Sequence, residues 1–299
     1  MQSTVDDMQT PHRVRHADVV PVRDHVPMLV DDHRMEAFQQ AINTVVKPDM
    51  YVLDLGAGSG VLSFFAAQQG ARVTAVEHEP VVFAAARSAL QDIGTHKVDM
   101  VLADARTYTP SEPVDVVICE MMHVGQLREH QMQVLREFKE NYLAAFDGGL
   151  PRFLPEACVM AAQPVQQDFT FHGYAVALPQ FQDPFTPQAR SVELADPLVY
   201  QQFFYDGPIP ERCTADLSFR IGRPGWLNAV RIITKNVLAG ELSPPSSVDW
   251  LMDYLVVPLP EPVYAHESDR VRITFDYRPG DEVHILAGSI RSRLTPAAS

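Results

Sequence analysis

The run "MYVLDLGAGSG", residues 50–60, constrains the fold more than any other part of this 299-residue chain. A short apolar run that ends in closely spaced glycines is typical of a buried strand entering a tight turn. The segment that follows, "VLSFFAAQQG", is typical of a helix that ends at Gly70. We therefore expect a strand–turn–helix unit that begins near residue 51.

The same alternation continues to about residue 146. "ARVTAVEHE", "VDMVLAD" and "VDVVICE" predict three further buried strands, and "PVVFAAARSALQDIG" predicts a helix between the first two of them. Apolar residues recur at helical spacing in "LREHQMQVLREFKENYLAAF" and, before the first strand, in "PMLVDDHRMEAFQQAINTVV". Alternating strands and helices predict an α/β fold with a doubly wound, Rossmann-like parallel sheet.

The pattern changes at "DGGLPRFLPEA". Beyond it proline becomes frequent, and short β-branched or aromatic runs such as "AVRIITKNVL", "RVRITFDY" and "EVHILAG" predict antiparallel strands in a barrel or sandwich. We therefore expect a polar lead-in at 1–24, a Rossmann-like ligand-binding domain at 25–150 and a barrel-like β-rich domain at 151–299.

Composition excludes several classes of function. The formal net charge of −14 argues against nucleic acid as a partner, because binding to its backbone depends on Lys and Arg contacts to phosphate. The three cysteines are widely spaced and predict neither a disulfide framework nor a metal site. The chain has no apolar run of about 18 residues, so we expect no membrane span and a cytoplasmic protein.

The glycine turn and a downstream acid predict a nucleotide-like ligand. Glycines let backbone approach a ligand closely, and Glu77 ends the next strand, where a carboxylate can accept both ribose hydroxyls. The alternative is a strand–turn–helix whose glycines serve packing alone. The candidate residues of the turn are Asp54, Gly56, Gly58 and Gly60.

The spacing in "DLGAGSG" resembles motif I of class I S-adenosylmethionine (SAM)-dependent methyltransferases. The resemblance implies SAM as cofactor and S-adenosyl-L-homocysteine as its product. It also implies that Asp104, in "LADAR", contacts the adenine, although a turn-forming Asp is an equal alternative.

Two longer segments are similar to protein arginine methyltransferases. "CEMMHVGQLREHQM" resembles their double-glutamate loop, S-E-W-M-G-Y-x-L-x-x-E-x-M, and "HVPMLVDDHRMEAF" resembles the segment that precedes motif I. By this resemblance Arg34 binds the SAM carboxylate, and His25 lines the active site. Met28 and Met122 are implied at the cofactor pocket.

The resemblance places Glu120 and Glu129 around a guanidinium group. A guanidinium stays protonated and presents a planar fork of N–H donors, which two carboxylates can hold in bidentate fashion. They can also localise positive charge on the nitrogens that are not methylated. The alternative is that both are ordinary helix-terminal carboxylates favoured by the helix dipole.

The chain departs from that family at several positions. Asp249, in "SSVDW", stands where the family has the His of a Thr-His-Trp loop, and could orient a cationic acceptor. Arg15 and Val19 stand where the family has the tyrosines of an N-terminal lid. These departures favour a small guanidino acceptor, such as free arginine, over a protein.

The leading hypothesis is therefore a SAM-dependent N-methyltransferase of a guanidino group, with a β-rich domain for substrate and dimerisation and a possible homodimer. One alternative is a methyltransferase of another small-molecule N, O or C acceptor. The other is a SAM-binding partner subunit without turnover.

Overall fold

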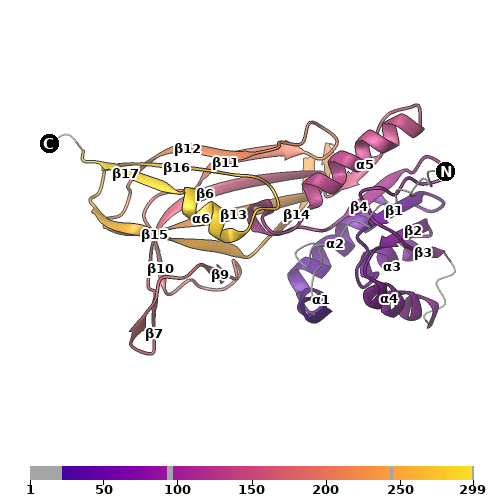
Figure 1. Ribbon diagram of the computed structural model, residues 1–299, viewed down its shortest axis with the longest axis horizontal. Coiled ribbons are helices and arrows are strands. Elements are labelled where there is room, and N and C mark those ends of the chain that lie inside the picture. Colours follow the sequence, from indigo (N-terminus) through magenta and orange to yellow (C-terminus); the bar gives the residue numbers. More distant parts are fainter. Residues whose placement is uncertain (1–21, 93–96, 243–244, 298–299) are drawn as a thin grey trace, which may run out of the picture.

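A five-stranded parallel sheet forms the centre of the N-terminal part (Figure 1). The computed structural model describes residues 22–92, 97–242 and 245–297. The strand order is β3-β2-β1-β4-β5, so the predicted Rossmann-like α/β fold is confirmed. The strands are β1 (Tyr51–Leu55), β2 (Arg72–Glu77), β3 (Val98–Leu102), β4 (Val116–Cys119) and β5 (Arg152–Leu154).

Helices cover both faces of this sheet because successive strand residues point to opposite sides. Leu53 and Val117 pack in one cluster with Phe138 of the helix at Gln131–Ala145, whereas Val52 and Ile118 pack in another. The second cluster also holds buried residues of the two helices that flank β1 in the chain. The helices are α1 (Val22–Leu29), α2 (Asp32–Val45), α3 (Val61–Gln68), α4 (Pro80–Asp92) and α5 (Gln131–Ala145).

The helical spacing before β1 is divided between two helices. α1 ends at Leu29, and Asp31 caps α2 by accepting a hydrogen bond of 3.0 Å from the backbone N–H of Arg34. The break places α1 beside the sheet edge described below. Residues 1–21 of the lead-in, with Arg15 and Val19, lie outside the described residues.

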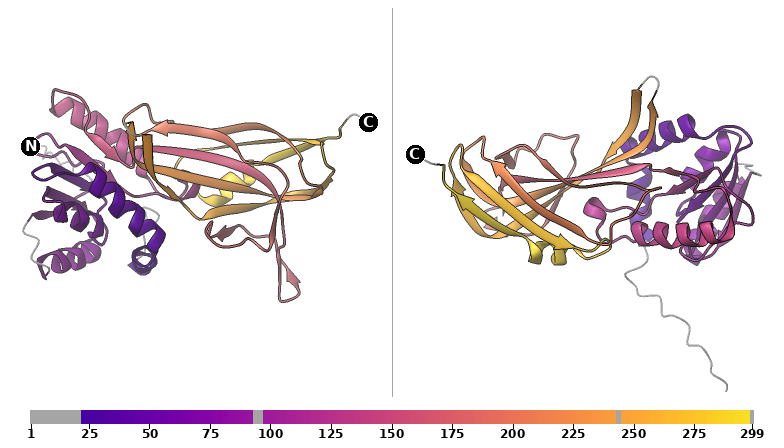
Figure 2. Two further views of the ribbon diagram at one scale, coloured as in Figure 1. Left: turned by 180° about the vertical axis from the view of Figure 1, so that it is seen from behind. Right: turned by 90° about the horizontal axis from the view of Figure 1, so that it is seen from above.

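The C-terminal part is rich in antiparallel strands, as predicted (Figure 2). Its largest sheet runs β10-β6-β13-β15-β9, with β11 on β6 and β14 on β13, and a smaller sheet runs β12-β16-β17. The strands of these sheets are β6 (Ala157–Gln167), β9 (Gln180–Gln182), β10 (Ser191–Glu193), β11 (Leu198–Phe204), β12 (Cys213–Arg220), β13 (Gly225–Leu242), β14 (Pro245–Leu251), β15 (Tyr254–Ala265), β16 (Arg270–Tyr277) and β17 (Arg291–Thr295). A separate hairpin joins β7 (Thr170–Phe171) to β8 (Tyr174–Ala175).

One predicted strand is wrong. "EVHILAG" forms a helix, α6 (Val283–Ser289), preceded by Glu282. Leu286 of this helix is buried, and Val283 and Ala287 pack against the same core cluster. These three residues lie on one face of a helix, so the apolar pattern of the segment fits a helix as well as a strand.

The two parts share one core. Buried residues of β1 and β4 belong to the same cluster as Met160 of β6 and Ile273 of β16. The parallel sheet ends at Leu154, and we propose that the boundary expected near residue 150 lies between β5 and β6. Among the described residues, no helix is long and apolar enough to cross a membrane.

Candidate functional site: an acidic cavity at the strand ends

A cavity of about 460 Å³ opens at the carboxyl ends of β1, β2 and β4. The chain order reverses there, because β2 and β3 extend the sheet on one side of β1 whereas β4 lies on the other. In open α/β sheets ligands bind at this switch point, and the volume lies in the range of small-molecule sites. The predicted residues that line it are His25, Met28, Arg34, Asp54, Gly56, Gly58, Glu77, Asp104, Glu120 and Glu129.

The glycine turn forms one wall of this cavity. Gly56 has φ of +73°, and a Cβ there would lie 2.6 Å from the sulfur of Met121. Gly58 has φ of +54°, and a Cβ there would lie 3.3 Å from the His25 ring. Any larger residue would be strained at both positions and would fill the space in front of the backbone.

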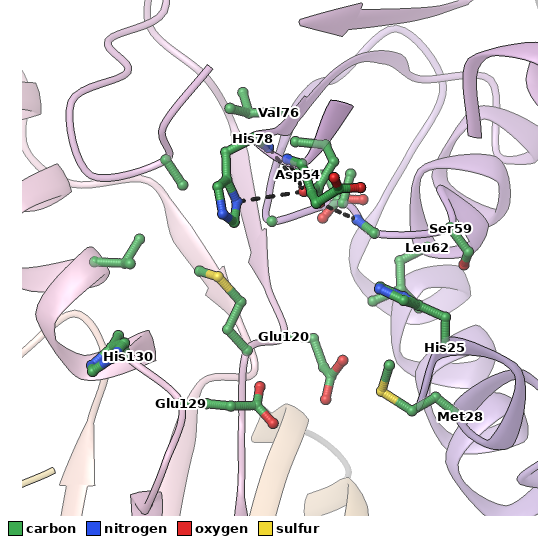
Figure 3. Close-up of a pocket in the computed structure, with 18 of the residues that line it drawn as sticks. His25, Met28, Asp54, Ser59, Leu62, Val76, His78, Glu120, Glu129 and His130 are labelled. Carbon is green, nitrogen blue, oxygen red and sulfur yellow. Dashed lines mark hydrogen bonds and ion pairs between the residues drawn. The ribbon is translucent and has the colours of Figure 1, made fainter. Parts of the chain in front are cut away.

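Glu77 lies opposite this turn and is held by backbone. Its carboxylate accepts hydrogen bonds from the N–H groups of Gly58 at 2.9 Å, His78 at 2.9 Å and Glu79 at 2.8 Å. The side chain is therefore fixed in place at the end of β2, at the cavity wall, before any ligand binds. Figure 3 shows its neighbour His78 directed toward the same cavity.

Asp54 is buried beneath the turn. Burial raises the pKa of its carboxyl to about 7, against the stabilising hydrogen bond of 2.7 Å from the Ser63 hydroxyl. Nearby Glu120 and Glu77 raise the pKa further. The cavity floor therefore favours a ligand that brings positive charge or hydrogen-bond donors.

Glu120 and Glu129 point into the same part of the cavity, with His25 and Met28 on the opposite wall (Figure 3). Burial raises the pKa of Glu129 from 4.5 to about 8, and repulsion by the Glu120 carboxylate adds to the effect. Burial also raises the pKa of Glu120, although Arg34 acts in the opposite direction. Two carboxyl groups in one desolvated space predict a cationic ligand between or beside them.

Arg34 contacts Glu120 directly. Its Nη2 donates to Oε2 of Glu120 in a short contact, and both side chains are about nine-tenths buried. Its Nη1 donates to the carbonyl of Met28 at 2.9 Å, while its buried Nε has no hydrogen-bond partner among residues 22–92, 97–242 and 245–297. Glu120 thus already binds a guanidinium group.

The 120–130 loop owes its shape to the C-terminal part. A short 3-10 turn, η2 (Val124–Gln126), contains Gly125, whose carbonyl accepts from the Tyr277 hydroxyl at 2.7 Å. Its N–H donates to the Thr234 hydroxyl at 2.7 Å. Glu129 lies two residues before the first residue of α5, next to the N-cap residue His130.

Three predicted residues do not line the cavity. Gly60 precedes α3 and packs against Leu90 of α4, and buried Met122 contacts the Tyr205 hydroxyl. Asp249 forms an ion pair of 2.5 Å with Lys235 on the neighbouring strand. Trp250, next in the chain, instead packs near the Arg34 guanidinium, 5.7 Å from its ring centre.

Sequence reasoning missed several residues at the site. Glu282, from the C-terminal part, lines the cavity and lies 3.7 Å from Arg128, which also lines it. Fully buried Gln131 accepts the Met121 N–H at 2.9 Å and so fixes the start of the loop. No sequence motif points to these residues. Among the described residues, no cluster of His, Cys, Asp and Glu could hold a metal ion.

Comparisons with known proteins identify similar sequences and structures. A family model described as a methyltransferase domain matches residues 52–141. An uncharacterised protein of Methanothermobacter thermautotrophicus is 33% identical over 270 residues, which cover 89% of this chain and 96% of the relative. A histone-arginine methyltransferase, CARMER of Drosophila erecta, is 39% identical over 109 residues, covering 36% of this chain and 21% of that protein.

Solved structures show the same two-part fold. The Trypanosoma brucei PRMT1 enzyme–prozyme complex with AdoHcy matches 91% of this chain and 96% of that chain, with a TM-score of 0.71 and 17% identity. Protein arginine methyltransferase 10 of Arabidopsis thaliana matches 85% of this chain and 87% of that chain, with a TM-score of 0.69 and 17% identity. The chain belongs to the family of the Methanothermobacter protein, within the class I SAM-dependent methyltransferases that are built like protein arginine methyltransferases.

Proposed function

We propose that this protein transfers the methyl group of SAM to a guanidino nitrogen of arginine or of an arginine-like small molecule. One observation carries the proposal: Glu120 and Glu129 share a desolvated cavity, and Glu120 already binds a guanidinium, that of Arg34. The same carboxylate chemistry suits a guanidinium brought in by the substrate.

The cavity fits the cofactor. Gly56 and Gly58 leave space that a Cβ would fill, and Glu77 is preset at the end of β2 for the ribose. The Nε of Arg34, which has no partner within the described part of the chain, is a donor for the carboxylate of the cofactor, and we propose Asp104 for the adenine. When bound, SAM supplies an activated methyl group on its sulfonium.

The two glutamates bind and orient the acceptor. Each carboxylate can accept from two N–H groups, so the pair holds the planar fork in one orientation. Both draw positive charge toward the nitrogens they contact, which leaves lone-pair density on the remaining nitrogen. Alignment of that nitrogen with the methyl donor is then the main requirement for transfer.

Glu129 is also suited to accept the proton that the methylated nitrogen must lose. Its pKa of about 8 lies close to the pH of the cell, whereas Glu120 is engaged by Arg34. Glu129 therefore serves as proton acceptor, and Glu120, paired with Arg34, helps to hold the cation. His25 and Met28 complete the wall opposite the carboxylates.

We propose a small acceptor rather than a protein. The CARMER relative acts on histones, but its similarity to this chain spans 109 residues. The chain departs from the arginine methyltransferase pattern at Asp249, Arg15 and Val19, which shape the acceptor side in that family. Asp249 lies outside the cavity, so we give it no catalytic role. We further propose that the protein forms a homodimer.

A methyl-transfer screen with labelled SAM tests the proposal. Free arginine, other small guanidines, Arg-containing peptides, and non-guanidino amines and hydroxy compounds form the panel. We expect label on a guanidine, and a loss of about 100-fold or more in kcat/KM for Glu120→Gln and Glu129→Gln, which keep the side-chain shape but remove the charge. Glu137→Gln, on the exposed face of α5, is the matched control.

Other outcomes separate the alternatives. Label on an amine, hydroxyl or carbon, but on no guanidine, identifies a different acceptor class. Tight SAM binding without transfer to any compound identifies a partner subunit without turnover. Activity on guanidines that survives Glu120→Gln unchanged contradicts the two-carboxylate mechanism.

A further inference from the structure

A segment of the C-terminal part reaches the α/β part beside the cavity. Residues 180–186, here called the strap, comprise β9 and the turn after it. β9 pairs with β15 through Leu255 and Phe181, and Figure 1 places it on the side of the β-rich part that faces α1. The turn is fixed by Asp183, whose carboxylate accepts the Phe185 N–H at 2.8 Å.

Two aromatic rings of the strap contact two histidines of the α/β part. Phe185 stacks on His33 with ring centres 3.9 Å apart, and Phe181 meets His123 edge to face at 5.5 Å. His33 precedes Arg34 on α2, whereas His123 lies three residues after Glu120 and lines the cavity. The strap therefore bridges α2, next to Arg34, and the 120–130 loop.

The strap rings are not part of the hydrophobic core. Phe181 is 51% exposed and Phe185 is 50% exposed, although each makes its ring contact. Such a pair contributes about 0.5–1.5 kcal/mol, so the fold does not depend on it. These half-exposed rings connect two elements of a ligand site, so we infer that they control which molecules enter that site.

The strap also carries negative charge beside the start of α2. Asp183 lies between the two phenylalanines in sequence. Burial raises the pKa of Asp253, and repulsion by the Asp183 and Asp31 carboxylates raises it further, so the three carboxyl groups share one neighbourhood. Asp31 caps α2 beside His33. A small cation is attracted to such a surface.

We propose that the strap selects the acceptor: it closes the side of the site between α2 and the 120–130 loop, admits a small guanidinium end-on, and excludes a polypeptide. An arginine within a polypeptide needs a groove that is open on both sides of the inserted side chain, and the strap removes one side. This inference rests on the proposed function and names its substrate class.

The test compares the double variant Phe181→Ala/Phe185→Ala with wild type. The matched control, Phe171→Ala/Tyr174→Ala, removes two exposed rings of the β7–β8 hairpin, where Phe171 packs on the Arg190 guanidinium and not on His33 or His123. Steady-state methylation of free arginine and of a peptide with one internal arginine gives the ratio of the two kcat/KM values. We expect wild type to prefer free arginine and the strap variant to shift the ratio toward the peptide by about ten-fold or more.

The binding of S-adenosylhomocysteine should stay unchanged in both variants, because the strap does not contact the glycine turn. A strap variant with the wild-type substrate ratio overturns the proposal. So does a wild-type protein that methylates the peptide as efficiently as free arginine. The Asp183→Asn variant should raise KM for free arginine and leave kcat unchanged, a split that a purely structural role would not produce.

A second measurement keeps the strap separate from the chemistry. Amide hydrogen exchange of residues 120–126, with S-adenosylhomocysteine bound, reports cover over the loop without any acceptor. We expect several-fold faster exchange there in the strap variant than in wild type or control, and unchanged exchange in α3. If wild type methylates no guanidine, the proposed function is wrong. If hydrogen exchange at residues 120–126 is the same in the strap variant as in wild type, the strap does not cover the loop, whatever the function is.

Discussion

Replacement of Glu129 by Gln should make the ligand-free protein more stable near neutral pH while it removes activity. Burial and the neighbouring Glu120 raise the pKa of Glu129 from 4.5 to about 8 in the folded protein. The unfolded chain ionises this group near its ordinary pKa, so the folded state binds the extra proton. Stability from this group is therefore fully present below the unfolded pKa and is lost as pH rises through the folded value.

The size of the effect follows from the two pKa values. Each pH unit between them costs about 1.4 kcal/mol, so Glu129 lowers the free energy of unfolding by about 3 kcal/mol between about pH 5 and about pH 7.5. Gln cannot ionise and lacks this loss. The difference in unfolding free energy between variant and wild type should therefore grow by about 3 kcal/mol over that range.

Urea denaturation of both proteins across this pH range measures the effect. The comparison of slopes cancels any constant difference in packing between the two side chains. Glu137→Gln, at an exposed position on α5, should run parallel to wild type. If the Glu129→Gln curve also runs parallel to wild type, Glu129 is not desolvated beside Glu120, and the description of the site is wrong.

Three further predictions follow from the site. As the pH rises from about 6 to about 8, KM for a guanidine acceptor should fall by up to about ten-fold per pH unit, because Glu129 must ionise to hold the cation. A KM that does not change with pH at saturating SAM contradicts this. Gly58→Ala should weaken S-adenosylhomocysteine binding by about ten-fold in calorimetry, since φ of +54° and the nearby His25 ring both oppose a Cβ; unchanged affinity would place the cofactor elsewhere. Asp249→Asn should change kcat/KM by less than about three-fold, because its ion pair with Lys235 lies outside the cavity; a loss of about 100-fold would give Asp249 a role in the reaction.

Local patterns predicted the fold class and much of the cavity. Strand periods, glycine turns and helix ends are short-range signals, so the α/β alternation could be assigned from them. Because parallel strands end at one edge, Asp54, Glu77 and Glu120 could be expected together from their positions at or near the ends of strands. Gly56 and Gly58 could be expected from the turn geometry alone.

Contacts between distant segments could not be predicted in the same way. Arg34 and Glu120 are 86 residues apart, and no periodicity shows that their side chains meet. Glu282 reaches the cavity from near the end of the C-terminal part. The apolar alternation of its segment predicts a strand, but the segment forms α6. Asp249 was placed by its neighbour Trp250, but adjacent strand residues point to opposite faces, so only Trp250 lies near Arg34.

Proton release on acceptor binding tests the central claim most directly. Calorimetric titration of arginine into the protein saturated with S-adenosylhomocysteine, in two buffers of different ionisation enthalpy, counts the protons exchanged. A group with a pKa of about 8 is about nine-tenths protonated at pH 7, so capture of a guanidinium by both carboxylates should release close to one proton from wild type and none from Glu129→Gln. Binding without proton release from wild type would mean that the cation does not lie against Glu129.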